Sequence, residues 1–208
     1  MRMIASASAL LLGLLAMGCN GELVGGGARE VNAVATGDGT ASASPSMAPA
    51  LRQALTPGGT ASFQSAGISG TVSFTARVEL VRGNSSVALQ PDPASATARA
   101  DGRDTMHVAE REVPRERYGV ARVTFSSVTA NVVSGLHIGG ATLTGRVDVG
   151  IPVGQGVVVE LPVDLGGANE DATLLIDLDA STWLAAADPV TRIVPASAFR
   201  GAVKLRGR

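Results

Sequence analysis

The sequence predicts an all-β protein, an antiparallel β-sandwich of about seven to nine short strands. Apolar and polar residues alternate with a period of two in most segments after residue 66. Gly- and Pro-containing turns separate these segments. No segment after residue 60 shows a convincing 3.6-residue helical repeat. A domain of this length, residues 66–208, is large enough to bury a core.

Residues 1–18 have the features of a secretory signal peptide. Arg2 supplies a positive charge, and an uncharged, mostly apolar stretch runs from Ile4 to Met17. This stretch is short for a bilayer span but suits the apolar region of a signal peptide. Ala16 and Gly18, small residues upstream of Cys19, fit cleavage directly before that cysteine.

Cys19 is the only cysteine and the predicted lipidation site. Residues 15–19 resemble a bacterial lipobox, although Leu15 lies one position early and Met17 stands where a small residue is usual. A lone thiol in an oxidising compartment would favour intermolecular disulfides, whereas a thioether-linked lipid removes that hazard. We expect attachment to the cell envelope through lipid on Cys19, with a soluble secreted form as the alternative. In similar lipoproteins, a residue other than Asp at the next position, here Asn20, is compatible with the outer membrane.

Residues 19–65 are predicted to form the lipidated N-terminus and a flexible linker. Three consecutive glycines end at Gly27, and residues 36–49 are mostly Gly, Ala, Ser, Thr and Pro. Such a composition buries too little apolar surface to offset the entropy of ordering. About 45 flexible residues would span about 35–40 Å root-mean-square. The domain is therefore expected to float clear of the lipid headgroups.

Residues 71–80 are the clearest predicted strand, with alternate residues from Val72 to Leu80 on one face. Phe74 belongs to this apolar face and Thr75 to the polar one. Shorter strands are expected near residues 86–89 and 105–113. Within residues 118–133 the apolar register changes, which predicts a bulge near Ser126 and Ser127.

The last third of the chain is predicted to contain four more strands, of which the first two form a hairpin. Alternation in residues 147–153 and again in 157–165 indicates two strands, joined by a turn at Gly154. Leu174, Ile176 and Leu178 then form an inward row, with Asp177 and Asp179 on the outward side. The final strand is expected near residues 202–205.

Three segments resemble a known family. Residues 113–125 read Val-Pro-Arg-Glu-Arg-Tyr-Gly-Val-Ala-Arg-Val-Thr-Phe, residues 174–181 read Leu-Leu-Ile-Asp-Leu-Asp-Ala-Ser, and residues 191–195 read Thr-Arg-Ile-Val-Pro. They are similar to strands of the bacterial lipoprotein family known as domain of unknown function 4382. The resemblance implies a lipid-tethered β-sandwich, transthyretin-like or related. It implies no reaction, because that family has no established activity.

The charge and the motifs exclude several functions. A net charge of −1 leaves no basic footprint for nucleic acid, and a single cysteine excludes a multi-cysteine metal site. Nucleophile, zinc-protease and phosphate-loop motifs are absent, so no cofactor is expected. His107 and His137 are better explained as strand or turn residues than as catalytic groups. Arg122, inside an apolar strand, is expected to hold a carboxylate across the sheet.

Two further groups of residues have both a functional and a structural interpretation. Glu170, Asp171, Asp177 and Asp179 are weak candidates for a Ca²⁺ site, since Ca²⁺ needs six to eight oxygen ligands; solvated outward carboxylates are the simpler explanation. Trp183, the only tryptophan, suits a core position better than an exposed sugar-stacking one.

Residues 99–117 contain ten charges of mixed sign. They suit either a charged partner or a solvated hairpin protected from edge-to-edge pairing.

These observations predict a non-enzymatic binding or structural module on the cell envelope, with an envelope protein or glycan as its partner. Two alternatives stay open. One is a carrier of small apolar ligands with a lipocalin-like barrel, which would need a closed cavity. The other is an envelope hydrolase, which would need His107 beside a Ser and a carboxylate.

Overall fold

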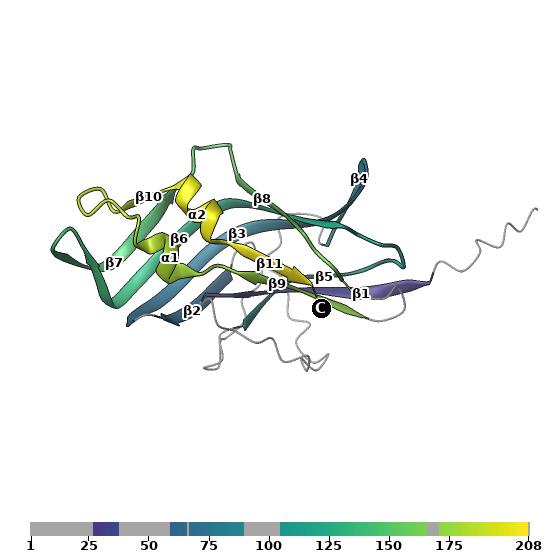
Figure 1. Cartoon of the computed structure of the whole chain (residues 1–208), viewed down its shortest axis with the longest axis horizontal. Coiled ribbons are helices and arrows are strands. Elements are labelled where there is room, and N and C mark those ends of the chain that lie inside the picture. The colour runs from purple at the N-terminus through teal and green to yellow at the C-terminus, as the bar shows by residue number, and fades with distance from the viewer. Residues whose placement is uncertain (1–26, 38–58, 66, 90–104, 166–170, 208) are drawn as a thin grey trace, which may run out of the picture.

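The chain folds into two β-sheets packed against each other, as the computed structural model shows (Figure 1). The structure describes residues 27–37, 59–65, 67–89, 105–165 and 171–207. Within these ranges it contains eleven strands and two short helices. The predicted all-β sandwich is confirmed. Both sheets end in edge strands, so the lipocalin-like closed barrel is wrong.

The larger sheet has seven strands and is built around two long ones. Its main path is β10-β7-β6-β3-β2, with β4 on β3 and β8 on β6. The strands are β2 (Gly59–Ser65), β3 (Ile68–Arg82), β4 (Ser85–Ala88), β6 (Val120–Ile138), β7 (Ala141–Gly150), β8 (Val157–Pro162) and β10 (Ile193–Pro195). Because β3 occupies one side of β6, β7 and β8 share the other side end to end.

The smaller sheet has four strands in the order β11-β9-β1-β5. They are β1 (Ala28–Thr36), β5 (Thr105–Pro114), β9 (Ala172–Asp177) and β11 (Lys204–Gly207). The β1–β9 pair is parallel, and so is the β7–β10 pair of the larger sheet. The prediction of a purely antiparallel sandwich is wrong at these two pairs, which join segments far apart in sequence.

The predicted linker over residues 19–65 is wrong where the structure describes that segment. β1 lies between β9 and β5, and Val31, Ala33 and Ala35 are fully buried. β2 pairs with β3 along its whole length. The reason is compositional: β1 is built mainly from alanine and valine and lies close to a glycine run, so it resembles a linker. These two strands, with the short β10, raise the count above nine.

The central strands of the larger sheet agree with the sequence pattern. Phe74 and its apolar neighbours on β3 are buried, which confirms the predicted inward face. Ser127 lies opposite Thr75 and Phe125 opposite Ala76, so Ser126 is the extra residue of a bulge. The bulge predicted at this point is confirmed. β4, β5 and β11 also lie near their predicted positions.

The predicted β7–β8 hairpin is wrong. β7 ends at Gly150, Val153 is fully exposed in the connection, and β8 pairs with β6 instead. Pro152 explains part of the difference, because its carbonyl closes a turn with Gln155 N and its ring carries no N–H for a ladder.

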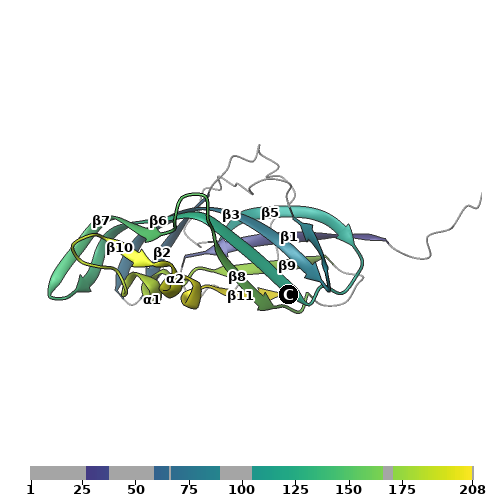
Figure 2. The same ribbon diagram turned by 90° about the horizontal axis from the view of Figure 1, so that it is seen from above.

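Two short helices complete the core. α1 (Ala180–Leu184) and α2 (Ala196–Ala202) lie beside β9 and β11 and cover part of the larger sheet (Figures 1 and 2). They are too short to give a detectable helical repeat. Four buried rings meet edge to face, with centroid distances of 5.8, 5.0 and 5.5 Å along Phe74, Phe125, Phe199 and Trp183. The expected core position of Trp183 is confirmed.

Among the helices that the structure describes, none has the length and apolar character needed to cross a bilayer.

Candidate functional site

The solvent side of the larger sheet, here called the outer face, is a polar surface that extends over several strands. The pleat of β3, β6 and β7 directs every second side chain toward it. Its exposed members include Ser73, Ser127, Asn131, Thr144 and Arg146. Hydroxyls bond to each other across strands, as between Ser127 Oγ and Thr75 Oγ1 at 3.1 Å. The surface thus offers many donors and acceptors in fixed register.

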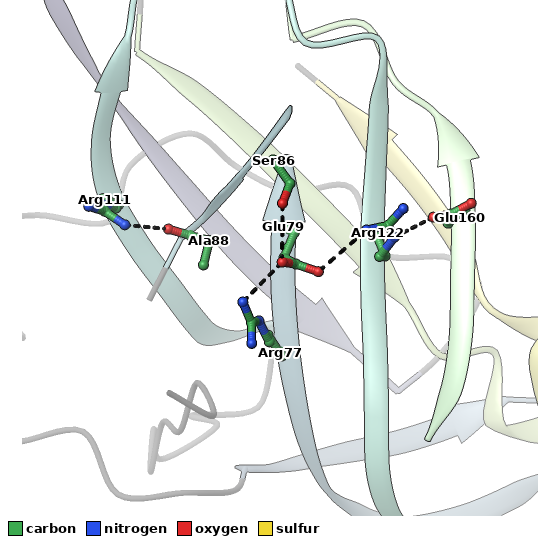
Figure 3. Close-up of polar contacts among 7 residues, drawn as sticks. All are labelled: Arg77, Glu79, Ser86, Ala88, Arg111, Arg122 and Glu160. Atoms are coloured by element: carbon green, nitrogen blue, oxygen red, sulfur yellow. Dashed lines mark hydrogen bonds and ion pairs between the residues drawn. The ribbon is translucent and has the colours of Figure 1, made fainter. Parts of the chain in front are cut away.

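A polar cluster of Arg77, Glu79, Ser86, Arg122 and Glu160 lies at one end of the outer face (Figure 3). Glu79, Arg122 and Glu160 are direct cross-strand neighbours on β3, β6 and β8. Arg122 Nε donates to Glu160 Oε1, and Arg122 Nη1 lies 3.8 Å from Glu79 Oε2. The expectation that Arg122 holds a carboxylate across the sheet is confirmed, and it does so on both sides.

Glu79 is the centre of this cluster. Its Oε1 accepts hydrogen bonds from Arg77 Nη2 at 3.1 Å and from Ser86 Oγ at 3.4 Å (Figure 3). Its side chain is only 12% exposed, against 55% for Arg77. The two arginines balance the two glutamates. The arginine side chains of these ion pairs are largely open to solvent, so the pairs add little stability. The cluster mainly fixes the positions of its hydrogen-bond donors and acceptors.

A second polar group lies on the smaller sheet, where Asp177 and Asp179 were predicted to be solvated. That prediction is wrong, because Asp177 is 3% and Asp179 8% exposed. Asp177 is flanked by Thr36 on β1 and Lys204 on β11. Its Oδ1 accepts a hydrogen bond from Asp179 N at 3.1 Å, and Asp179 Oδ2 accepts one from Lys204 Nζ at 2.8 Å.

The two carboxylates of this group have pKa shifts in opposite directions. Burial raises the pKa of Asp177, and the nearby Asp179 charge adds to the effect. Burial also acts to raise the pKa of Asp179, but hydrogen bonds from Lys204 and neighbouring hydroxyls outweigh it, so this pKa is lowered. The backbone of Asp179 adopts a left-handed φ of 43°, which lets it begin α1 directly after β9.

The calcium candidates do not come together in the part of the chain that the structure describes. Asp171 precedes β9 and its Oδ1 accepts a hydrogen bond from Glu30 N at 3.0 Å. Asp177 and Asp179 lie at the other end of β9. Glu170 is outside the described residues. Within the described ranges no three His, Cys, Asp or Glu side chains form a group suited to a metal.

The two histidines belong to different sheets. His137 is exposed on β6, and its Nδ1 lies 3.0 Å from Thr142 Oγ1 on β7. It therefore occupies a strand position, as expected. The backbone of His107 belongs to β5, opposite Val34. Its side chain and the predicted lipidation site Cys19 are outside the described residues.

The charged segment of residues 99–117 is described from residue 105. It includes β5, which is an edge strand of the smaller sheet, as the protected-edge interpretation requires. Arg111 Nη1 donates to Ala88 O at 3.0 Å, which joins this edge to β4 (Figure 3). Glu110 and Glu112 flank Arg111 on the strand.

A cluster of arginine contacts lies at the end of the sandwich where β1 begins, here called the proximal end. The sequence did not predict this cluster. Arg29 is buried, and it donates from Nη1 to Leu165 O at 3.2 Å and from Nη2 to Glu116 O at 3.4 Å. Arg115 Nε donates to Ala28 O at 3.1 Å. Arg82 forms an ion pair with Glu116. The signal in the sequence that could have indicated this cluster is Arg29, which lies just before a run of valine and alanine residues.

Comparison with protein-family models, with curated proteins and with solved structures gave no match in any of the three. The resemblance to domain of unknown function 4382 therefore stays a prediction.

Proposed function

We propose that this protein is a lipid-anchored component of a bacterial cell envelope, whose β-sandwich is a non-enzymatic binding or structural module. The observation that carries the proposal is the position of Cys19. It is the only thiol of the chain and directly follows a segment with signal-peptide features. Attachment to a membrane through lipid on Cys19 would explain both facts.

The geometry of the outer face supports a binding role. Its charged groups are paired with one another, as Arg122 is with Glu79 and Glu160, and Arg146 with Asp148. Paired groups hold their orientation and present polar atoms without a net charge. Such a surface suits a polar envelope protein or a glycan better than a strongly charged partner.

The anchor is tested by substituting the cysteine. Cys19→Ser should stop incorporation of a palmitate analogue and move the protein from the membrane to the soluble fraction. Ser65→Ala serves as a control substitution that leaves the lipidation site intact. An unlabelled, soluble wild-type protein would show that the lipoprotein proposal is wrong.

The binding role is tested by crosslinking in intact envelopes, with mass spectrometry of the captured partners. We expect Arg146→Glu on the outer face to reduce capture of a specific partner, and Arg200→Glu on α2 to leave it unchanged. Equal capture by both variants would exclude the outer face as the binding surface.

A further inference from the structure

We infer that the proximal end of the sandwich docks on the membrane surface, with exposed arginines of the β5–β6 loop against anionic lipid headgroups. This inference rests on the lipid anchor proposed above and adds the orientation and the membrane contact of the anchored domain.

The first argument is the length of chain between the anchor and the fold. Gly27, where the described structure begins, lies only eight positions after Cys19. No conformation of eight residues exceeds about 26–29 Å, and as a flexible chain they average about 14–17 Å. A domain held this closely cannot float clear of the headgroups as a domain on a long linker would.

The second argument is where β1 begins in the molecule. β1 begins at one end of the long axis, opposite the β6–β7 hairpin (Figures 1 and 2). Contacts tie three other segments to the same end: Glu116 of the β5–β6 loop, Arg82 beside the β3–β4 turn, and Leu165 after β8. The short tether therefore directs this set of loops toward the bilayer.

The third argument is the chemistry of the β5–β6 loop. Arg115 and Arg117 are exposed on either side of Glu116, and Glu116 already pairs with Arg82. Arg117 makes no hydrogen bond or ion pair in the part of the chain that the structure describes. An exposed guanidinium without a partner can bind a headgroup phosphate bidentately. Asp164 and Asp171 also lie at this end. Because these carboxylates repel anionic headgroups, the attraction to the membrane is restricted to the arginines of the β5–β6 loop.

Fluorescence energy transfer to the bilayer tests the orientation. The introduced thiols are Gly119→Cys in the β5–β6 loop and Val190→Cys near the β6–β7 hairpin, each the only free thiol once Cys19 carries lipid. A Cβ at position 119 has no atom within 4 Å, and Val190 is 87% exposed. The full-length lipoprotein is reconstituted in phosphatidylethanolamine–phosphatidylglycerol vesicles containing an acceptor on the headgroups.

We expect strong transfer from position 119 and weak transfer from position 190. Equal or reversed transfer would overturn the orientation. Incorporation of a palmitate analogue is measured on the same preparations. If the protein takes up label but transfer is equal, only the docking inference fails; if it takes up no label, the anchor fails and the inference with it.

A charge reversal tests the headgroup contact. Arg117→Glu should lower the ratio of docked to undocked protein about fivefold or more in the anionic vesicles, since one basic residue near such a surface contributes about a factor of five to this equilibrium. It should have little effect in phosphatidylcholine vesicles. Arg200→Glu is the matched control, because Arg200 is exposed on α2 and has no hydrogen bond or ion pair with the described residues. Identical behaviour of the two variants would overturn the role of the loop arginines.

Discussion

The central strands of the two sheets differ in how many of their faces are buried. In the larger sheet, β3 buries one face and presents the other to solvent, so its residues alternate strictly. In the smaller sheet, β9 is buried on both faces: Leu174 and Ile176 belong to the main core, while Leu175 packs with Val34 in a separate cluster. The larger sheet is therefore a surface with a core side, whereas the centre of the smaller sheet, where β9 meets the second half of β1, is an internal layer. The edge strand β11 still exposes Lys204 and Arg206.

This difference explains where polar groups are found. On the larger sheet, charged residues such as Arg122 form exposed ion pairs, which can be changed at small cost. On the smaller sheet, Asp177 is enclosed between β1 and β11 and depends on specific hydrogen bonds. The larger sheet can thus vary its outer surface for recognition, whereas the centre of the smaller sheet is constrained by packing on both sides.

The largest effect should come from removing β1, the strand that joins the two halves of the smaller sheet. A chain lacking residues 1–58 should lose cooperative thermal unfolding. β5 would lose its strand partner, β9 would keep only β11, and the fully buried Val31, Ala33 and Ala35 would be missing. Each fully buried aliphatic side chain of valine size contributes about 1.5–3 kcal/mol, against a typical total of about 5–15 kcal/mol.

A chain lacking only residues 1–26 is the control. Circular dichroism should show a single thermal transition for it, with a midpoint near that of the full-length chain. If both truncations melt alike, β1 contributes little and the centre of the smaller sheet is not an internal layer.

The same difference decides what could be predicted from the sequence. The solvated strand β3 and the bulge at Ser126 were predictable, because a half-exposed strand records its two faces as alternation. β1 was missed because small buried residues near glycines resemble a linker. Asp177 was wrongly predicted to be exposed, because alternation alone cannot show that the outward face of its strand is also buried. The cross-strand role of Arg122 was predictable, while the cluster around Arg29 needed the long-range fold.

A smaller effect is expected from truncating single side chains on the two strands. On β3, Phe74→Ala should destabilise by about 3–5 kcal/mol, and Thr75→Ala by less than about 1 kcal/mol. On β9, the adjacent residues should behave alike, with Leu174→Ala and Leu175→Ala each costing about 2–5 kcal/mol, since both are buried. Chemical denaturation measures all four free energies of unfolding.

The pattern of these four values is informative beyond their size. One large and one small effect on β3, with two large effects on β9, would support one solvated and one internal strand. A small effect of Leu175→Ala would mean that the second face of β9 is open, and the contrast between the sheets would disappear.

The smallest effect concerns the pH dependence of the smaller sheet. The pKa of Asp177 is raised by burial, so its contribution to stability is present below the unfolded pKa and is lost as pH rises through the folded pKa. For Asp179, burial is outweighed by the hydrogen bond from Lys204 and the pKa is lowered, so its contribution is present above the unfolded pKa and is lost as pH falls through the folded pKa. Asp177→Asn should therefore stabilise the protein at pH 7 and have little effect near pH 3. The amide oxygen of the introduced asparagine can still accept the hydrogen bond from Asp179 N. Asp179→Asn should destabilise at pH 7 by about 1 kcal/mol, because Lys204 is half exposed and the pair is partly screened. Urea denaturation of both variants at the two pH values gives the four differences. If both substitutions destabilise equally at pH 7, Asp177 is ionised without cost, and this part of the smaller sheet is as open to water as the outer face of the larger one.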